Sequence, residues 1–347
     1  MPDIFSQSSD VKVAVIGGGT GSFTVLSGLK NYTRKIAALV NMADDGGSTG
    51  KLRDELGALP PGDVRQCLVA LARTPELRDL FNYRFEGGSL EGHAFGNLFL
   101  TALEKMTGDF SQATELAGKM LNISGVVEPI TLTNVALVMT KTNGERTEGE
   151  NKIGNMDFSG DRPNFTLEPA AELNPKARQA IMKADLVVIA PGNLYGSLAP
   201  ALVVPGVGEA LSQTEAKKVY VCNLVTKPGQ TDNFKVSDFA DEVERLAGAK
   251  FLDAVIYNTE KPSPQLLDKY AKEGELSVDY NLSTLEERHY QHYGTNLLSG
   301  EIWQNPNSHS DPIASQRTLI RHDTDAVAQA ILSAYRDLNY QQSEARI

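Results

Sequence analysis

The chain has 347 residues, 41% of them hydrophobic, and its 44 acidic against 33 basic residues give a formal net charge of -11. This length allows a large core in one or two domains of roughly 150 residues, and the acidic balance without a lysine- or arginine-rich block argues against nucleic acid as a partner. The apolar runs are far shorter than the ~18 residues of a membrane span, and residues 1–12 do not resemble a signal peptide, so we expect a cytoplasmic protein without a membrane partner.

Strands and helices alternate along the chain after a loose segment at residues 1–10. "VKVAVIGGG" predicts a strand that runs into glycines, "TGSFTVLSGLKNY" has helical spacing, and "KIAALVN" predicts a second strand. Further apolar strands are predicted at "NVALVM", "ADLVVIAPG", "KKVYVCNLV" and "LDAVIYNT". The alternation predicts an α/β fold: a Rossmann-like, doubly wound, mostly parallel sheet.

Two stretches depart from this alternation. Residues 60–122 have helical spacing and no flanking linker, which predicts a helical insert folded against the sheet. Residues 140–175 are polar and dotted with glycine, which predicts a strand-and-turn excursion, and residues 281–316 are polar as well. We therefore expect a single domain over residues 11–338, followed by a polar tail at 339–347.

The first strand ends in the glycine-rich segment "AVIGGGTGS". Glycines between a strand and a helix allow a phosphate to approach the backbone, where free N–H groups and the helix dipole favour an anion. Gly17 and Gly19 fit the dinucleotide pattern G-x-G-x-x-G, whereas Ser22 stands in the third glycine position, and no Walker A lysine follows. The alternative is a turn that is merely tight.

The second strand ends in Asn41 and is followed by "MADDGGSTGKLR". An NAD enzyme would carry an acidic residue in place of Asn41, so a dehydrogenase is disfavoured. Asp44 and Asp45 form a hard-oxygen loop at the carboxyl ends of the strands, which suits either a Mg²⁺ held partly by phosphates or a proton transfer. An exposed Asp-Gly turn is the structural alternative.

Two predicted helix starts add polar side chains. In "PPGDVRQCL" the helix begins near Asp63, so that Arg65 could clamp a phosphate and Gln66 could contact a base or sugar. "EGHAFGNLFL" has Gly96 and Asn97 before an apolar helix, with His93 just upstream. For His93, ligand contact and a structural role both stay open.

A later strand delivers "APGNLYGSLAPALVVPG" to the same predicted edge of the sheet. Its loop carries Gly192, Asn193, Tyr195 and Ser197, and the tyrosine is suited to stacking on a base or sugar. Arg321, in "LIRHDTD", precedes the last helix and could reach an anion from the C-terminal side.

Six motifs in order, "VIGGGTGS", "VNMADDGGSTGKLR", "PPGDVRQCLVAL", "GHAFGNLFL", "APGNLYGSLAPALVVPG" and "IRHDT", resemble the gluconeogenesis factor (YvcK-like) family. That family is related to CofD, the 2-phospho-L-lactate transferase. The resemblance spans about residues 12–337 and implies a CofD-like fold in a cytoplasmic bacterial protein. It also implies binding of UDP-N-acetylglucosamine and a link to growth on gluconeogenic carbon sources and to cell shape.

The resemblance assigns residues of this chain to a nucleotide site. It implies that residues 17–21 and 62–66 contact the phosphates, with Asp44 and Asp45 beside them as tentative metal ligands. The candidate ligand-binding residues are Gly17, Gly18, Gly19, Thr20, Gly21, Asn41, Gly62, Asp63, Arg65, Gln66, His93, Gly96, Asn97, Gly192, Asn193, Tyr195, Ser197 and Arg321.

Two functional hypotheses follow. The first is a regulatory protein that binds a nucleotide or nucleotide sugar without turnover. The second is a CofD-type transferase, in which Asp44 or Asp45 holds Mg²⁺ and acts in catalysis. Trp303, the one tryptophan, lies outside the glycine motifs and so offers no obvious slot for a large flavin-like acceptor. Mg²⁺ is the one cofactor considered, and a homodimer stays open.

Overall fold

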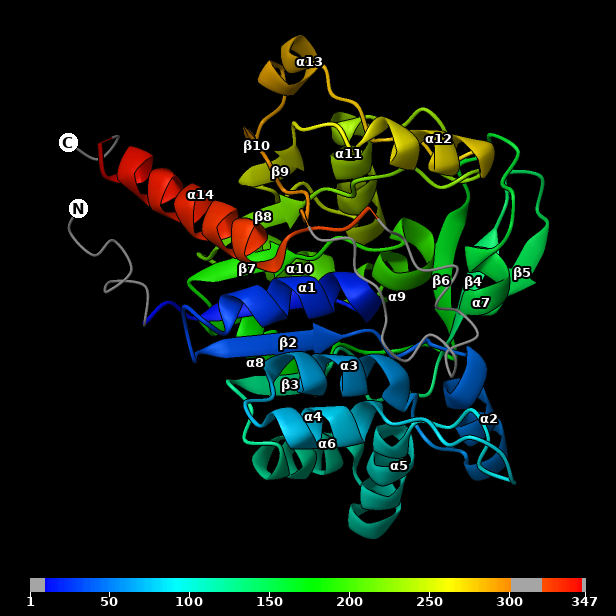
Figure 1. Cartoon of the computed structure of the whole chain (residues 1–347). Coiled ribbons are helices and arrows are strands. Elements are labelled where there is room, and N and C mark those ends of the chain that lie inside the picture. Colours follow the sequence, from blue (N-terminus) through cyan, green and yellow to red (C-terminus); the bar gives the residue numbers. More distant parts are fainter. Residues whose placement is uncertain (1–9, 301–319, 345–347) are drawn as a thin grey trace.

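The computed structural model describes residues 10–300 and 320–344, which form a parallel sheet flanked by helices (Figure 1). The sheet has seven strands in the order β10-β9-β8-β7-β1-β2-β3, and every neighbouring pair is parallel. In that order the strands are Gln291–Thr295, Ala254–Asn258, Lys217–Val221, Leu186–Ile189, Val13–Gly17, Ile36–Val40 and Val126–Pro129. The predicted fold class is confirmed.

The first strand, β1, lies in the interior of the sheet, which explains why its residues are apolar. All five residues of β1 are buried, and Val13 pairs with Ile36 of β2 on one side and Leu186 of β7 on the other. From β1 the chain runs outward through β2 to β3, and later returns to β7 on the opposite side. The carboxyl ends of β1 and β7 therefore flank a topological switch point, where open α/β sheets bind their ligands.

The strand "NVALVM" was expected in the parallel sheet, and that prediction was wrong. It forms β4 (Ala136–Thr140), the centre of a separate antiparallel sheet in the order β5-β4-β6, with β5 at Arg146–Glu148 and β6 at Asn164–Glu168. A short apolar run does not reveal which sheet will bury it. The edge strands β3 and β10 were not predicted, and β10 lacks an apolar pattern because it is largely exposed.

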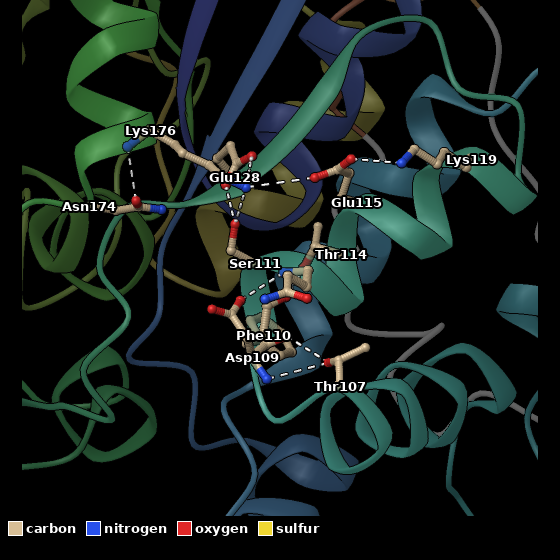
Figure 2. Close-up of polar contacts among 11 residues, drawn as sticks. Thr107, Asp109, Phe110, Ser111, Thr114, Glu115, Lys119, Glu128, Asn174 and Lys176 are labelled. Carbon is tan, nitrogen blue, oxygen red and sulfur yellow. Dashed lines mark hydrogen bonds and ion pairs between the residues drawn. The ribbon is translucent and has the colours of Figure 1, made fainter.

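Residues 60–122 contain four helices, which are drawn below β2 in Figure 1. These helices are α3 (Pro61–Leu71), α4 (Pro75–Asn82), α5 (Phe95–Thr107) and α6 (Phe110–Met120). A polar cluster ties α6 to β3 and α8 (Figure 2). Ser111 Oγ donates to Glu128 Oε2 at 2.9 Å and lies 2.9 Å from Lys176 Nζ, which is 3.8 Å from Glu128 Oε1. The insert is thus anchored to the sheet by an interaction that buries Glu128.

Helices α1, α3 and α14 pack side by side against the sheet (Figure 1). The other helical bounds are α1 Gly19–Leu29, α2 Gly47–Leu56, α7 Glu150–Gly154, α8 Pro175–Lys183, η1 Leu194–Leu198, α9 Ala199–Leu202, α10 Val207–Gln213, α11 Val236–Ala247, α12 Pro264–Lys272, α13 Leu282–Glu286 and α14 Thr324–Glu344. Residues 339–344, expected as a polar tail, continue helix α14. The expected loose segment at 1–9, Trp303 and residues 345–347 lie outside the described residues.

Within residues 10–300 and 320–344, no single helix has the length and apolar composition of a membrane span. One bent pair, Leu194–Leu202 with Val207–Gln213, meets those two criteria jointly.

Candidate functional site

The glycine turn after β1 faces the start of helix α3. Gly18 is the N-cap residue of α1, and a Cβ placed on it would overlap Asp63 Oδ2. The backbone N–H of Gly19 donates to the Asp63 carboxylate. Residues 17–21 and 62–66, which lie far apart in the sequence, therefore meet at the switch point of the sheet.

Asp63 lies where a bound anion was expected. The first N–H groups of a helix attract negative charge, and at α1 that charge is supplied by a side chain that is only 8% exposed. Burial, and next the neighbouring Asp44 carboxylate, raise the pKa of Asp63 to about 7. A carboxyl group that exchanges its proton near neutral pH thus lies directly against the glycine turn.

Asp63 belongs to a cluster with Asp44 and Glu150, which we call the acid cluster. Burial and then the charges of Asp44 and Asp63 raise the pKa of Glu150 well above its usual range, and burial also raises that of Asp44. The Asn41 side chain hydrogen-bonds to Asp63 and, through Nδ2 at 3.5 Å, to Glu150 Oε2. Asn41, which was predicted to contact the ligand, is therefore fully buried, and its side-chain amide bridges two carboxyl groups.

Asp44 is fixed by the loop that leads into α2. Its Oδ1 accepts from the N–H of Gly46 at 3.0 Å, and its side chain also bonds to Thr49. A Cβ on Gly62 would lie 2.5 Å from both Asp44 Oδ2 and Thr49 Oγ1. A side chain at position 62 would overlap Asp44 and Thr49, because α3 begins directly against these residues.

Asp45 points to a different neighbour, the first turn of α7. Its Oδ1 accepts from the backbone N–H of Asn151 at 2.8 Å, and a Cβ on Gly149 would lie 2.6 Å from its Oδ2. This contact positions Glu150 at the acid cluster. The metal and catalytic roles suggested for Asp44 and Asp45 stay predictions, but the structure gives the two aspartates different surroundings.

Arg65 supplies positive charge beside the acid cluster. Its Nε donates to Asn97 Oδ1 at 2.9 Å and its Nη1 to Asn82 Oδ1 at 2.6 Å, and the residue is 7% exposed. The guanidinium lowers the pKa values of Asp44 and Asp63, although burial outweighs it in both. Arg65 is thus held in place by two amides, and its role as a phosphate clamp stays a prediction.

A hydrogen-bonded chain continues from Asn97 to His93. Asn97 Nδ2 donates to Ser48 Oγ at 3.3 Å, and Ser48 Oγ lies 3.0 Å from Nδ1 of the buried His93. A Cβ on Gly96 would lie 2.8 Å from Arg65 Cδ, so this glycine lets the arginine side chain pass. The structure thereby joins the predicted residues of α3 and α5 to Ser48, in the first turn of α2.

Comparison with known proteins shows to which family this chain belongs. Residues 13–298 match the family described as 2-phospho-L-lactate transferase CofD, which is well over half of the chain. The chain belongs to the CofD family. Within it, the gluconeogenesis factor of Bacillus subtilis (strain 168) is 36% identical over 328 residues, which cover 94% of this chain and 98% of the relative. The resemblance found in the motifs is therefore confirmed.

Two further relatives of this CofD-family chain come from Halalkalibacterium and Bacillus. The gluconeogenesis factor of Halalkalibacterium halodurans is 37% identical over 322 residues, covering 92% of this chain and 95% of that protein. The crystal structure of a upf0052 family member from Bacillus halodurans superposes with a TM-score of 0.83 at 36% identity, covering 93% of this chain and 99% of that chain. Both sequence and structure thus place the chain among the gluconeogenesis factors of the CofD family.

The loop after β7 closes the other side of the switch point. A Cβ on Gly21 would overlap the carbonyl oxygen of Pro191, so α1 touches this loop through its backbone. Asn223 Nδ2 donates to the carbonyl oxygen of Gly192 at 2.6 Å. Ser197 Oγ would lie 3.9 Å from a Cβ on Gly19, which brings this predicted residue to the glycine turn.

The side chains of Tyr195, in η1, and of Asn193, its N-cap residue, contact other parts of the protein. The Tyr195 ring is 2% exposed and stacks on Phe165 at a centroid distance of 5.1 Å, with Phe158 at 5.0 Å. Asn193 Oδ1 accepts from the N–H groups of Tyr195 and Gly196 and so caps η1. Both side chains already have partners within the protein. A stacking role for Tyr195 on a ligand would require its ring to leave the aromatic core.

Three predicted residues lie apart from these contacts. Thr20 is exposed in the first turn of α1, and Gln66 is half-buried in α3. Arg321 lies just before α14, where its carbonyl oxygen accepts from the N–H of Ser299 at 2.9 Å. Their contacts with a ligand stay predictions.

Sequence reasoning missed Glu150, Ser48 and Asn82 as parts of the site. Glu150 lies in the polar segment expected as an excursion, 109 positions after Asn41, its hydrogen-bond partner. The fold of β4 and β5 brings it back to the switch point, and no local pattern signals this return. Ser48 stands in the quoted loop, where its hydroxyl had no assigned partner.

Proposed function

We propose that the region where the glycine turn meets the acid cluster binds the diphosphate of a nucleotide sugar together with Mg²⁺. The observation that supports this is the meeting of the α1 N-terminus with Asp44, Asp63 and Glu150 at the switch point. The chain then acts as a binding protein in regulation. Family membership suggests UDP-N-acetylglucosamine as the nucleotide sugar, in a role linked to growth on gluconeogenic carbon sources and to cell shape.

Charge is the reason for including a cation. Asp44 raises the pKa of Asp63, and both raise the pKa of Glu150, so the three carboxyl groups cannot all ionise cheaply. A diphosphate would add further negative charge beside them. Arg65 offers a single positive charge, already shared with two asparagines. A divalent cation among these oxygens would favour the ionised carboxylates and the diphosphate at once.

The donor set fits Mg²⁺ as a jointly held ion. Within the described residues, no group of three or more His, Cys, Asp or Glu side chains is arranged to hold a metal ion alone. Mg²⁺ commonly uses one or two carboxylates together with phosphate oxygens and water, and carboxylate oxygen is the donor it prefers. Asp44 and Asp63 would hold it, and when bound it would neutralise the diphosphate.

We expect the affinity for UDP-N-acetylglucosamine to depend on both Mg²⁺ and Asp44. In isothermal titration calorimetry, EDTA or Asp44→Asn should each weaken binding by about tenfold or more, the size of a lost charge-assisted contact. Asp54→Asn, which removes an exposed acidic group from α2, is the matched control and should stay within about twofold. Equal affinity with and without Mg²⁺ would contradict the role of the cation.

A transferase activity is the second candidate, and the surroundings of Asp63 favour it. A carboxyl group with a pKa of about 7 is suited to accept a proton from an attacking hydroxyl near neutral pH. The reaction would join an acceptor oxygen to the phosphoryl group of a nucleotide-linked donor and release a nucleoside monophosphate. Release of that monophosphate with a deazaflavin acceptor, abolished by Asp63→Asn, would establish turnover; its absence in wild type would leave the binding role alone.

A further inference from the structure

A pocket lies between η1, α11 and the loops at 158–162 and 229–234. Its volume is about 310 Å³, at the lower end of the range for small-molecule sites. Of the described residues that line it, none belongs to the acid cluster. The site proposed for the nucleotide sugar therefore does not account for this pocket.

The rim of the pocket is acidic. Asp161, Asp232, Asp238 and Asp241 line it, against one basic residue, Arg162. The Asp232 residue is exposed, and no hydrogen bond or ion pair joins its carboxylate to another described residue. The opening of the pocket thus presents negative charge to solvent.

The arginines near the pocket are already paired. Arg162 donates to the fully buried Glu242 through Nε at 2.8 Å and Nη2 at 2.7 Å, and Arg245 pairs with the same carboxylate. Arg288 Nη2 lies 2.6 Å from Asp241 Oδ2. Two arginines therefore share one internal glutamate and a third offsets Asp241. Asp161 accepts from the Thr142 N–H and hydroxyl and from the Arg162 N–H, and Asp238 accepts from the Lys235 N–H, so Asp232 is the carboxylate of this group without a described partner.

Gln230, which lines the pocket, has a buried acceptor oxygen without a hydrogen-bond partner among the described residues. Gln230 is 7% exposed, and its Nε2 donates to the carbonyl oxygens of Ile153 and Met156, each at 2.9 Å. These two contacts fix the amide orientation, because a flipped amide would place its oxygen against both carbonyls. Gln230 Oε1 has no hydrogen-bond partner within the described part of the chain. A buried acceptor of this kind calls for a donor.

Aromatic rings complete the lining. Phe158, Tyr195 and Phe234 all border the pocket. Phe158 and Tyr195 are buried in the aromatic core, so the half-buried Phe234 is the ring that a ligand can reach. The faces of such rings attract cations, and guanidinium groups stack on them. Negative charge at the rim, an acceptor in the wall and aromatic faces favour the same ligand chemistry.

From these features we propose that this pocket is a second ligand site, which takes a small organic cation with a guanidinium group. The guanidinium donates hydrogen bonds to Gln230 Oε1 and to the Asp232 carboxylate, and it stacks on the ring of Phe234. The size of the pocket fits a free small molecule rather than a folded partner. Because Gln230 also holds α7, the helix that begins with Glu150, the ligand would contact a side chain that supports the acid cluster.

The test compares two probes of the same shape that differ in charge. Butylguanidinium chloride and its neutral isostere, butylurea, are titrated at constant ionic strength into the isotopically labelled full chain, followed by backbone amide NMR. Butylguanidinium should shift signals of residues 158–162 and 229–234 with a dissociation constant of roughly 0.1 to 10 mM, as expected for a ligand of this size. Butylurea should bind at least about fivefold more weakly.

Two matched variants locate the charge effect. Asp232→Asn should weaken butylguanidinium binding by about threefold or more, whereas Asp268→Asn, an exposed acid on α12 away from the pocket, should change it by less than about 1.5-fold. Equal binding of the two probes, equal effects of the two variants, or no shifts at residues 229–234 would each overturn the proposal. None of these measurements involves the nucleotide sugar, so they fail or succeed separately from the function proposed above.

Discussion

Gly18→Ala is expected to destabilise the protein by about 2 to 3 kcal/mol, the usual cost of forcing an atom into a packed site. Gly18 has φ -152° and ψ 175°, a conformation that alanine adopts without strain. The cost therefore comes from the added methyl group, which would overlap the Asp63 carboxylate. Chemical denaturation at constant pH measures the loss.

A double-mutant cycle assigns this cost to Asp63. In an Asp63→Ala background the Gly18→Ala penalty should fall by at least about 1 kcal/mol, because the overlapping atoms are gone. Gly57→Ala is the control: its φ of +59° strains any L-residue, yet a Cβ there meets nothing within 4 Å. The Gly57→Ala cost of about 1 to 2 kcal/mol should be the same in both backgrounds. An unchanged Gly18→Ala penalty would show that residues 17–21 and 62–66 do not meet.

Asp63→Asn is expected to stabilise the free protein at pH 8 by roughly 1 to 3 kcal/mol. The pKa of Asp63 is raised from 3.8 to about 7 by burial and by Asp44, so the ionised form is disfavoured in the folded state. Asparagine keeps the shape and an acceptor oxygen for the Gly19 N–H, without the charge. Affinity for Mg²⁺ and the diphosphate should fall in the same variant.

The stability difference between Asp63→Asn and the wild type should depend on pH in one direction. Below pH 3.8 the carboxyl group is protonated in both states and costs nothing. As the pH rises toward 7, the unfolded chain loses the proton while the folded protein keeps it, so wild-type stability falls and the deficit is complete above the folded pKa. The advantage of Asp63→Asn should therefore be larger at pH 8 than at pH 5 in thermal melts. A constant or reversed difference, or the same trend in Asp54→Asn, would contradict it.

Together these predictions describe a site that is unfavourable for the free protein. Carboxyl groups whose pKa values are raised by burial and by neighbouring carboxylates lower stability, and proteins tolerate such costs where a ligand will use the groups. Mg²⁺ with a diphosphate would be such a ligand for Asp44, Asp63 and Glu150. Stabilisation of the folded state by both together, beyond that from either alone, follows from the same charge argument.

The parallel sheet and the glycine turn could be predicted because their signals are local. Apolar, β-branched strands such as β1 and β7 are buried on both faces, and glycines at the end of β1 mark the start of α1. The edge strands were missed for the converse reason: β10 is mostly exposed and has no apolar pattern. β4 has such a pattern but pairs with β5 and β6, a choice made by distant segments.

The sequence alone determined the family, the α/β class and the loops at the carboxyl ends of the strands, because motif order and strand periodicity are written along the chain. Only the tertiary structure decided which side chains share the site. Glu150 joins Asp44 and Asp63 through a strand excursion, and Tyr195 turns into the aromatic core instead. Such contacts depend on packing between distant segments, and burial beside other carboxyl groups is what raises the pKa of Asp63 to about 7.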